Sequence, residues 1–120
     1  MMHTCKISQL DIPEEVKNDI NTAIDTLLEK FHNNIHKIIL FGSYAKDEYQ
    51  PDSDVDIAVS LYSLPSVKER RIYSHTLNLE DFEKTDREID LLFCTKEQLD
   101  SNTMVYKWIN AQGVILYEQL

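Results

Sequence analysis

Two aspartates stand two residues apart at the start of an apolar stretch that runs from Asp54 to Leu61 (DVDIAVSL). Alternate residues of a β-strand point to opposite faces of its sheet, so both aspartates lie on one face and Val55, Ile57 and Val59 on the other. Aspartate is depleted in strands, and a buried carboxylate destabilises a protein unless a partner compensates its charge. The pair therefore predicts a strand whose two carboxylates face a cation or a ligand.

Three more stretches have the pattern of strands. Lys37 to Phe41 (KIILF) is almost wholly apolar, which indicates a strand that is covered on both faces. Arg87 to Cys94 (REIDLLFC) and Val114 to Tyr117 (VILY) are short apolar runs of strand length. Together with the stretch after Asp54, they predict one small sheet.

Helical spacing of apolar residues separates these strands. We expect a first helix after Asp11, whose spacing to Glu14 resembles a capping box, with an end near residues 32–34. A second helix opens at Pro65 and ends near residues 81–84, and a third follows Thr95, with Gly113 just past its end. In the third helix, the apolar face continues through Met104, Val105, Trp108, Ile109 and Ala111. The order predicts an α/β or α+β fold, a small mixed β-sheet flanked by helices, in one domain over residues 1–120.

Charge and composition narrow the classes of partner. The formal net charge is −9, which disfavours direct binding of nucleic acid and suits a cation or a basic protein partner. No apolar run approaches the roughly 18 residues of a membrane-spanning helix. Cys5 and Cys94 form no CxxC pair, and the first ten residues lack the apolar core of a secretion signal, so we expect a cytoplasmic protein with reduced thiols.

A third carboxylate extends the acidic pair. Asp90 stands in the middle of the strand-like stretch from Arg87 to Cys94, with apolar residues on both sides. Like charges on one face raise each other's pKa unless a cation lies between them, and Mg²⁺ prefers carboxylate oxygens together with water and phosphate. If the strand of Asp90 lies beside that of Asp54 and Asp56, the three acids form one metal site.

A Gly-Ser turn stands ten residues before the first aspartate. Gly42 allows backbone to approach a ligand closely, and backbone N–H groups at a helix start, with the Ser43 hydroxyl, can bind phosphate. Each feature alone is common and usually structural. Their joint order, an anion site that faces an acidic metal cluster, is the layout for phosphoryl or nucleotidyl transfer.

The motif Phe41-Gly42-Ser43, followed ten residues later by Asp54-Val55-Asp56-Ile57, resembles the signature of the DNA polymerase β-like nucleotidyltransferase superfamily. It is most similar to the minimal nucleotidyltransferase (MNT-domain) branch, the antitoxin partners of HEPN-domain toxins. The resemblance implies the polymerase β-like fold, two Mg²⁺ ions and ATP.

The resemblance also implies roles for single residues. Asp54, Asp56 and Asp90 would be both the metal ligands and the catalytic carboxylates. Gly42 and Ser43 would hold the β- and γ-phosphates of the nucleotide. Many relatives have a basic residue directly after the serine, a role that we expect Lys46 to take here. Tyr44 adjoins the turn and is our candidate for stacking on the adenine.

Three functions remain open at this point. The first is an antitoxin that transfers AMP from ATP to a tyrosine of a HEPN ribonuclease toxin. The second is a non-catalytic antitoxin that occludes the toxin, with any nucleotide only a structural ligand. The third is a small-molecule nucleotidyltransferase, whose relatives usually carry an additional helical region for the acceptor.

Overall fold

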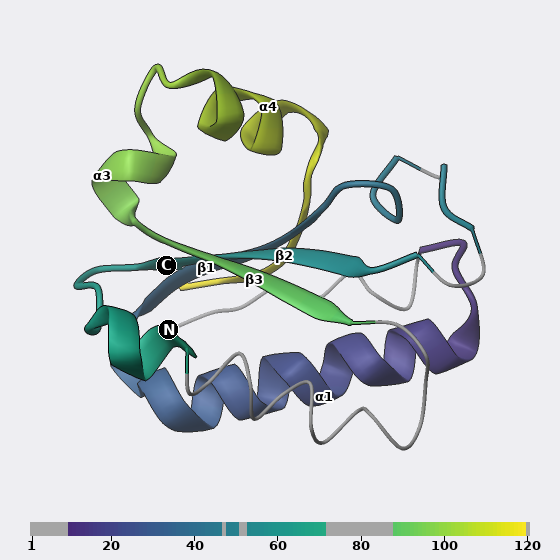
Figure 1. Cartoon of the computed structure of the whole chain (residues 1–120), viewed down its shortest axis with the longest axis horizontal. Helices are drawn as coiled ribbons and strands as arrows, with labels where there is room; N and C mark the ends of the chain where they lie inside the picture. The colour runs from purple at the N-terminus through teal and green to yellow at the C-terminus, as the bar shows by residue number, and fades with distance from the viewer. Residues whose placement is uncertain (1–9, 47, 51–52, 72–87, 120) are drawn as a thin grey trace.

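The computed structural model describes residues 10–46, 48–50, 53–71 and 88–119. Within them, one sheet forms the middle layer of the molecule, with the long helix α1 on one face and the short helices α3 and α4 on the other (Figure 1). The predicted small mixed sheet flanked by helices is confirmed.

The sheet has the strand order β3-β2-β1-β4. Its strands are β1 (Ile35–Phe41), β2 (Val55–Leu61), β3 (Ile89–Thr95) and β4 (Val114–Glu118). Strand β1 is antiparallel to both of its neighbours, β2 and β4, whereas β2 and β3 are parallel. All four strands lie within two residues of the positions that the apolar stretches predict.

Helix α1 (Glu14–Phe31) follows the predicted periodicity. Its inner face buries Val16, Ile20, Ala23, Ile24 and Leu27. The capping box that we expected at Asp11 is wrong. Pro13 is the N-cap residue, and no side chain caps the helix. Proline already lacks the N–H that a first turn leaves unpaired, and the acids that follow it suit the positive end of the helix dipole.

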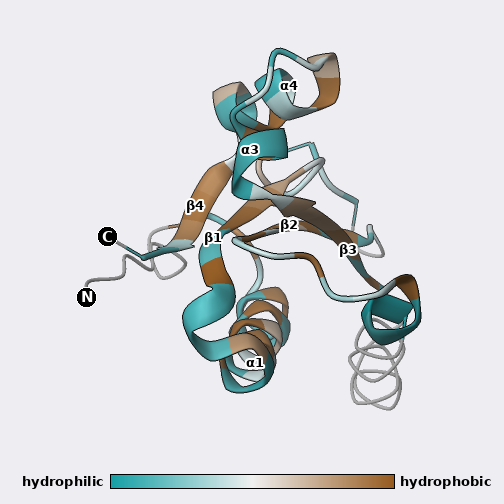
Figure 2. Ribbon diagram, turned by 90° about the vertical axis from the view of Figure 1, so that its left-hand side faces the viewer, coloured by the Kyte–Doolittle hydropathy of each residue, from teal (hydrophilic) through white to brown (hydrophobic). Residues whose placement is uncertain are grey.

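Each face of the sheet has its own apolar cluster. The larger one lies between the sheet and α1, and the smaller one lies under α3 and α4. Alternate residues of β2 divide between them, with Val55, Ile57 and Val59 in the first and Ala58 in the second, as predicted. Figure 2 shows this layering, with mainly hydrophobic strands and helices of mixed hydropathy.

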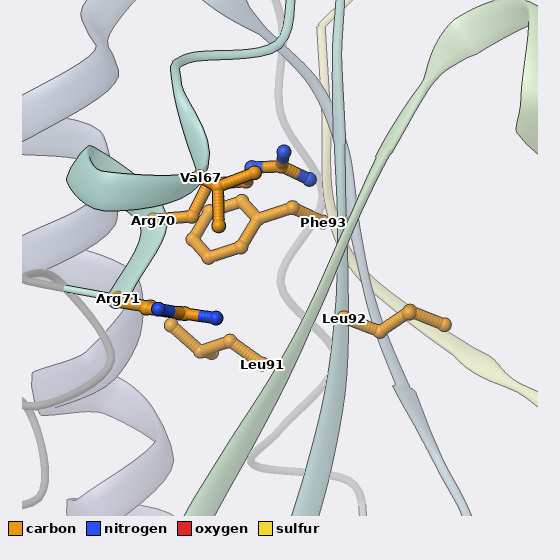
Figure 3. A pocket seen from close by; sticks show the side chains of 6 residues that line it. All are labelled: Val67, Arg70, Arg71, Leu91, Leu92 and Phe93. Atoms are coloured by element: carbon orange, nitrogen blue, oxygen red, sulfur yellow. The ribbon is translucent and has the colours of Figure 1, made fainter.

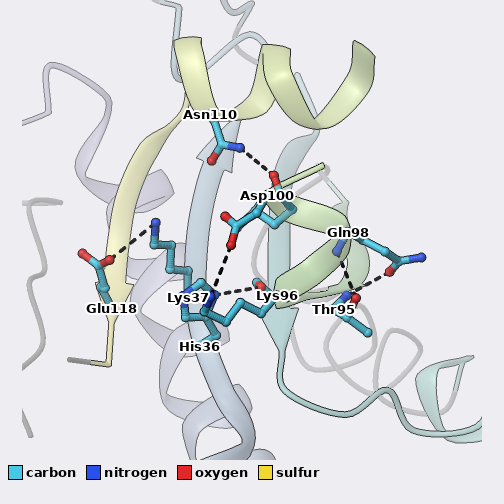
Figure 4. A network of polar contacts seen from close by, with 10 residues as sticks. His36, Lys37, Thr95, Lys96, Gln98, Asp100, Asn110 and Glu118 are labelled. Carbon is cyan, nitrogen blue, oxygen red and sulfur yellow. Dashed lines mark hydrogen bonds and ion pairs between the residues drawn. The ribbon is translucent and has the colours of Figure 1, made fainter. Parts of the chain in front are cut away.

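The single helix that we expected after Thr95 is wrong. The chain after β3 forms two short helices, α3 (Lys96–Leu99) and α4 (Met104–Gln112), separated by residues 100–103. The Thr95 cap is confirmed, because its hydroxyl accepts the Gln98 N–H at 3.1 Å while the Gln98 side chain accepts the Thr95 N–H at 2.9 Å (Figure 4). The expected apolar face is wrong for α4. Of its residues only Ile109 is buried, whereas Met104 is 81% exposed and Trp108 is 38% exposed.

Polar contacts hold α4 and β4 in place. The Asn110 amide donates to the Leu99 carbonyl at 2.8 Å, and Lys37 pairs with Glu118 at 3.4 Å (Figure 4). Gly113 ends α4 as predicted, but its φ of −76° is open to any residue. Glycine is required there by close packing, because a Cβ would meet Ile39 and would lie 2.5 Å from the Ile109 carbonyl oxygen.

The predicted second helix is only partly within the described residues. Residues 67–71 are helical, and the rest of it falls in residues 72–87, outside them. No helix in the described ranges has both the length and the apolar character needed to cross a membrane.

Candidate functional site

The three predicted acids meet at one end of the sheet. Strand β1 ends at Phe41, opposite Asp56 near the start of β2, and Asp56 is in turn opposite Asp90 near the start of β3. Because β2 and β3 are parallel and in this register, Asp56 and Asp90 are neighbours on the same face. That face is the one covered further along by α3 and α4, since Ala58 and Leu92 belong to the smaller cluster.

Asp54 is fixed by the backbone of the neighbouring strand. Its Oδ1 accepts the Glu88 N–H at 3.1 Å, and the Val55 N–H donates to the Glu88 carbonyl at 2.8 Å. The start of β2 is therefore joined to the start of β3 directly before both acids. No local pattern in the sequence signals this backbone contact, because it depends only on how two distant strands pair.

The electrostatics connect the same three side chains. Burial raises the pKa of Asp56, and the charges of Asp90 and Asp54 raise it further. Burial also raises the pKa of Asp90, with a second contribution from the charge of Asp54. The three carboxylates are thus close enough to repel one another, which is the situation that a bound cation relieves.

Gly42 lies against the central carboxylate. Its φ is +76°, in the left-handed region that side chains disfavour. A Cβ at this position would overlap Asp56 Oδ2 and lie 3.1 Å from Asp56 Cγ. Both its backbone conformation and its surroundings therefore require glycine, and the turn after β1 is brought into contact with the acidic group.

Two backbone hydrogen bonds close the turn that begins at Gly42. The Lys46 N–H donates to the Gly42 carbonyl at 3.2 Å, and the Glu48 N–H donates to the Ser43 carbonyl at 2.9 Å. Tyr44 lies under this turn. It is 3% exposed, and its ring stacks on that of Tyr49 with 4.7 Å between the centroids. In this structure Tyr44 is part of the larger core and supports the turn from below.

Lys46 connects the turn to α4. Its Nζ lies 4.8 Å from the centroid of the Trp108 ring and 3.6 Å from Glu48 Oε2. A cation over an indole face is attracted by the ring quadrupole. The predicted phosphate ligand therefore lies over an aromatic side chain that the apolar spacing had placed on the apolar face of a helix.

A divalent cation suits the donor set but is not enclosed by it. Carboxylates at the ends of neighbouring strands are ligands of the kind that Mg²⁺ takes, and their mutual repulsion favours a cation between them. In the described part of the chain, however, no group of three or more His, Cys, Asp or Glu side chains stands in a position to hold a metal ion. The carboxylates would have to turn toward a common point, with water and phosphate as further ligands.

A pocket of about 400 Å³ lies away from this site (Figure 3). In Figure 3, Leu91 and Phe93 point from β3 toward Arg70 and Arg71, whereas Leu92 points the other way. Asp90 shares the face of Leu92, because residues of a strand alternate. The pocket is therefore on the opposite side of β3 from the acids and is not part of the site.

Residues 21–119 match the sequence model of one protein family, described as polymerase beta, nucleotidyltransferase. The match includes the Gly-Ser turn and all three acids. The chain belongs to the polymerase β nucleotidyltransferase family.

Two curated relatives of this nucleotidyltransferase come from Methanocaldococcus jannaschii. The putative protein adenylyltransferase MJ0141 is 36% identical over 62 residues, which are 52% of this chain and 56% of that protein. The putative protein adenylyltransferase MJ0604 is 45% identical over 40 residues, 33% of this chain and 40% of that protein. The matches thus span about half the length of these curated relatives.

Solved structures of toxin–antitoxin complexes share the nucleotidyltransferase fold. A crystal structure of a toxin–antitoxin with AMP-PNP has a TM-score of 0.62 at 25% identity, covering 82% of this chain and 73% of that one. A structure of the tri-AMPylated Shewanella oneidensis HEPN toxin in complex with MNT antitoxin contains a chain that matches with a TM-score of 0.58 at 23% identity. The match covers 88% of this chain and 73% of that one. The sequence resemblance to MNT-domain proteins is thereby confirmed at the level of the fold.

Proposed function

We propose that this protein is a Mg²⁺-dependent nucleotidyltransferase that transfers AMP from ATP to a tyrosine of a partner HEPN ribonuclease toxin and so neutralises it. The observation that carries the proposal is the contact of Gly42 with Asp56, in a group of three carboxylates in which burial and the neighbouring charges raise the pKa of Asp56 and of Asp90. The names of the M. jannaschii relatives and the toxin–antitoxin structures support the same chemistry and partner. An ATP-consuming enzyme of this kind would act in the cytoplasm.

Each predicted residue has a role in this proposal. Asp54, Asp56 and Asp90 would hold Mg²⁺, which when bound neutralises charge on the phosphates and lowers the pKa of an attacking hydroxyl. Gly42 and Ser43 would hold the β- and γ-phosphates at the turn, and Lys46 would add a positive charge beside them. Tyr44, with its ring buried, would keep the turn in shape.

The reaction is an exchange at the α-phosphorus. The tyrosine oxygen of the acceptor forms a bond to the α-phosphorus of ATP while the bond to the β-phosphate oxygen breaks, which releases pyrophosphate. The phenolic proton must leave, and free tyrosine has a pKa of about 10. Asp90 would accept it as a positioned carboxylate, and the bound Mg²⁺ would lower the pKa of the attacking hydroxyl.

Charge favours a protein rather than a nucleic acid as acceptor. The net charge of −9 would repel phosphates, whereas a ribonuclease needs a basic surface to hold RNA and can therefore meet this protein favourably. AMP on a tyrosine of that surface adds a negative group where RNA phosphate must bind, which would inhibit the toxin by repulsion.

Intact-mass spectrometry of the partner after co-expression tests the proposal. The partner should gain the mass of one or more AMP groups with the parent protein and none with the variant Asp54→Asn, Asp56→Asn. A partner that is unmodified in both cases, yet inhibited in both, would contradict the transfer reaction and support inhibition by occlusion.

A further inference from the structure

The exposed side of α4 next to the Gly-Ser turn carries an aromatic ring. Trp108 is 38% exposed, and its neighbours Met104 and Val105 are also exposed, so this side of the helix has no covering within the described residues. Lys46 Nζ lies 4.8 Å from the Trp108 ring centroid. The ring is therefore one lysine side chain away from the turn that we assign to phosphate.

A chain of contacts leads from the acids to this ring. Gly42 lies against the Asp56 carboxylate, the Lys46 N–H donates to the Gly42 carbonyl at 3.2 Å, and the Lys46 ammonium lies over Trp108. The acids, the turn and the indole are therefore joined by consecutive contacts.

We propose that Trp108 is the platform on which the base of the bound nucleotide stacks. The inference rests on the proposed function, because it assumes that a nucleoside triphosphate binds at the turn. Lys46 is held by an exposed pair with Glu48 at 3.6 Å and by the ring, both weak interactions. A phosphate can attract the ammonium away from the indole at little cost, and the uncovered ring face can then accept a purine.

Tyr44, the stacking candidate of the sequence, is less suited to this role. Its ring is 3% exposed and stacks on Tyr49, so neither face is open to a base. Trp108 has a larger ring, lies at the surface and already accepts a cation on its face. Aromatic rings stack on every base, so this platform would favour nucleotides over bare polyphosphate without strict choice among bases.

The experiment compares two ligands in the presence of Mg²⁺: AMP-PNP, a non-hydrolysable ATP analogue, and inorganic tripolyphosphate. Trp108 is the sole tryptophan of the chain, so its fluorescence reports on this site alone. AMP-PNP should quench the emission strongly, whereas tripolyphosphate should cause a smaller change, due only to the displacement of Lys46.

Calorimetry on variants separates the base from the phosphates. Trp108→Ala should weaken AMP-PNP binding about tenfold, equivalent to about 1.4 kcal/mol, and leave tripolyphosphate binding unchanged, while Trp108→Phe should retain most of the AMP-PNP affinity. Lys46→Met should weaken the binding of both ligands. Met104→Ala, on the same exposed side of α4, is the matched control and should bind both ligands like the parent.

Different failures would mean different things. Binding of neither ligand by the parent would overturn the proposed function and this inference together. Equal binding of AMP-PNP by Trp108→Ala and the parent would overturn the base platform but leave the proposed function standing. If that variant instead lost its association with the toxin, the exposed side of α4 would be a protein interface, which also overturns the platform.

Discussion

Asp56 is the residue at which strand geometry and charge conflict most strongly. It is half-buried between the end of β1 and the start of β3, and burial, Asp90 and Asp54 all raise its pKa. A carboxyl whose folded pKa is raised binds its proton more tightly in the folded state than in the unfolded one. The stability of the metal-free protein should therefore fall as the pH rises from the ordinary carboxyl pKa of 3.8 through the raised value.

The variant Asp56→Asn tests this linkage. Asparagine cannot ionise, so the metal-free variant should be more stable than the parent at neutral pH, and the difference should shrink as the pH falls below the carboxyl range. Thermal unfolding over a series of pH values measures it, with Glu97→Gln on the exposed start of α3 as control. A variant that is less stable than the parent at neutral pH would contradict the repulsion among the acids.

Gly42 should be needed for both stability and activity. Gly42→Ala places a side chain in the left-handed region, which costs on the order of 1–2 kcal/mol, and pushes a methyl group into the Asp56 carboxylate. We expect a loss of stability of that size in urea unfolding and a larger loss of transfer activity, because Asp56 must move. Ser43→Ala should keep its stability within about 0.5 kcal/mol. A Gly42→Ala protein with full activity would mean that the turn does not position the acid.

At the scale of elements, the cap of α3 is the sharpest local prediction. Thr95→Ala removes the hydroxyl that accepts the Gln98 N–H and should cost about 1 kcal/mol in urea unfolding. Thr95→Ser retains the hydroxyl and should cost much less. Equal losses in the two variants would show that packing of the threonine methyl, and not the cap, stabilises this end of β3.

The helices and strands also show which patterns in the sequence were sufficient to predict the fold and the site. Helix α1 and the strands were predictable because their apolar spacing is set by burial against one another. The acids could be placed together because an aspartate inside an apolar strand is unfavourable unless a cation or a partner compensates its charge.

Helix α4 was not predictable in the same way. Apolar spacing placed Trp108 on the apolar face of a helix, but α4 covers a small part of the sheet and buries Ile109 alone. The contact of Asp54 with the Glu88 N–H likewise depends on strand pairing that no local pattern records.

At the scale of the molecule, the two faces of the sheet differ: one carries most of the apolar core and the other carries the acidic site. The face toward α1 carries the larger core, with most of the large apolar side chains of β1 and β2, whereas the other face carries the acids at one end and a small cluster under α3 and α4. Because stability comes mainly from the first face, charge can gather on the second without unfolding the protein. Since the net charge is also −9, cations of any kind should raise the stability of the metal-free protein.

Specific binding of Mg²⁺ can be distinguished from this general screening. MgCl₂ should raise the thermal unfolding temperature of the parent more than NaCl of equal ionic strength does, because an ion that binds only the folded state at 100 times its Kd adds about 2.7 kcal/mol. In the double variant Asp54→Asn, Asp56→Asn two of the three proposed ligands lose their charge, so MgCl₂ and NaCl should raise the unfolding temperature alike. In NaCl this variant should be at least as stable as the parent, because the repulsion among the acids is relieved. If MgCl₂ stabilised the parent and the double variant equally beyond NaCl, the ion would be bound elsewhere on the acidic surface, and the assignment of these carboxylates as metal ligands would be wrong.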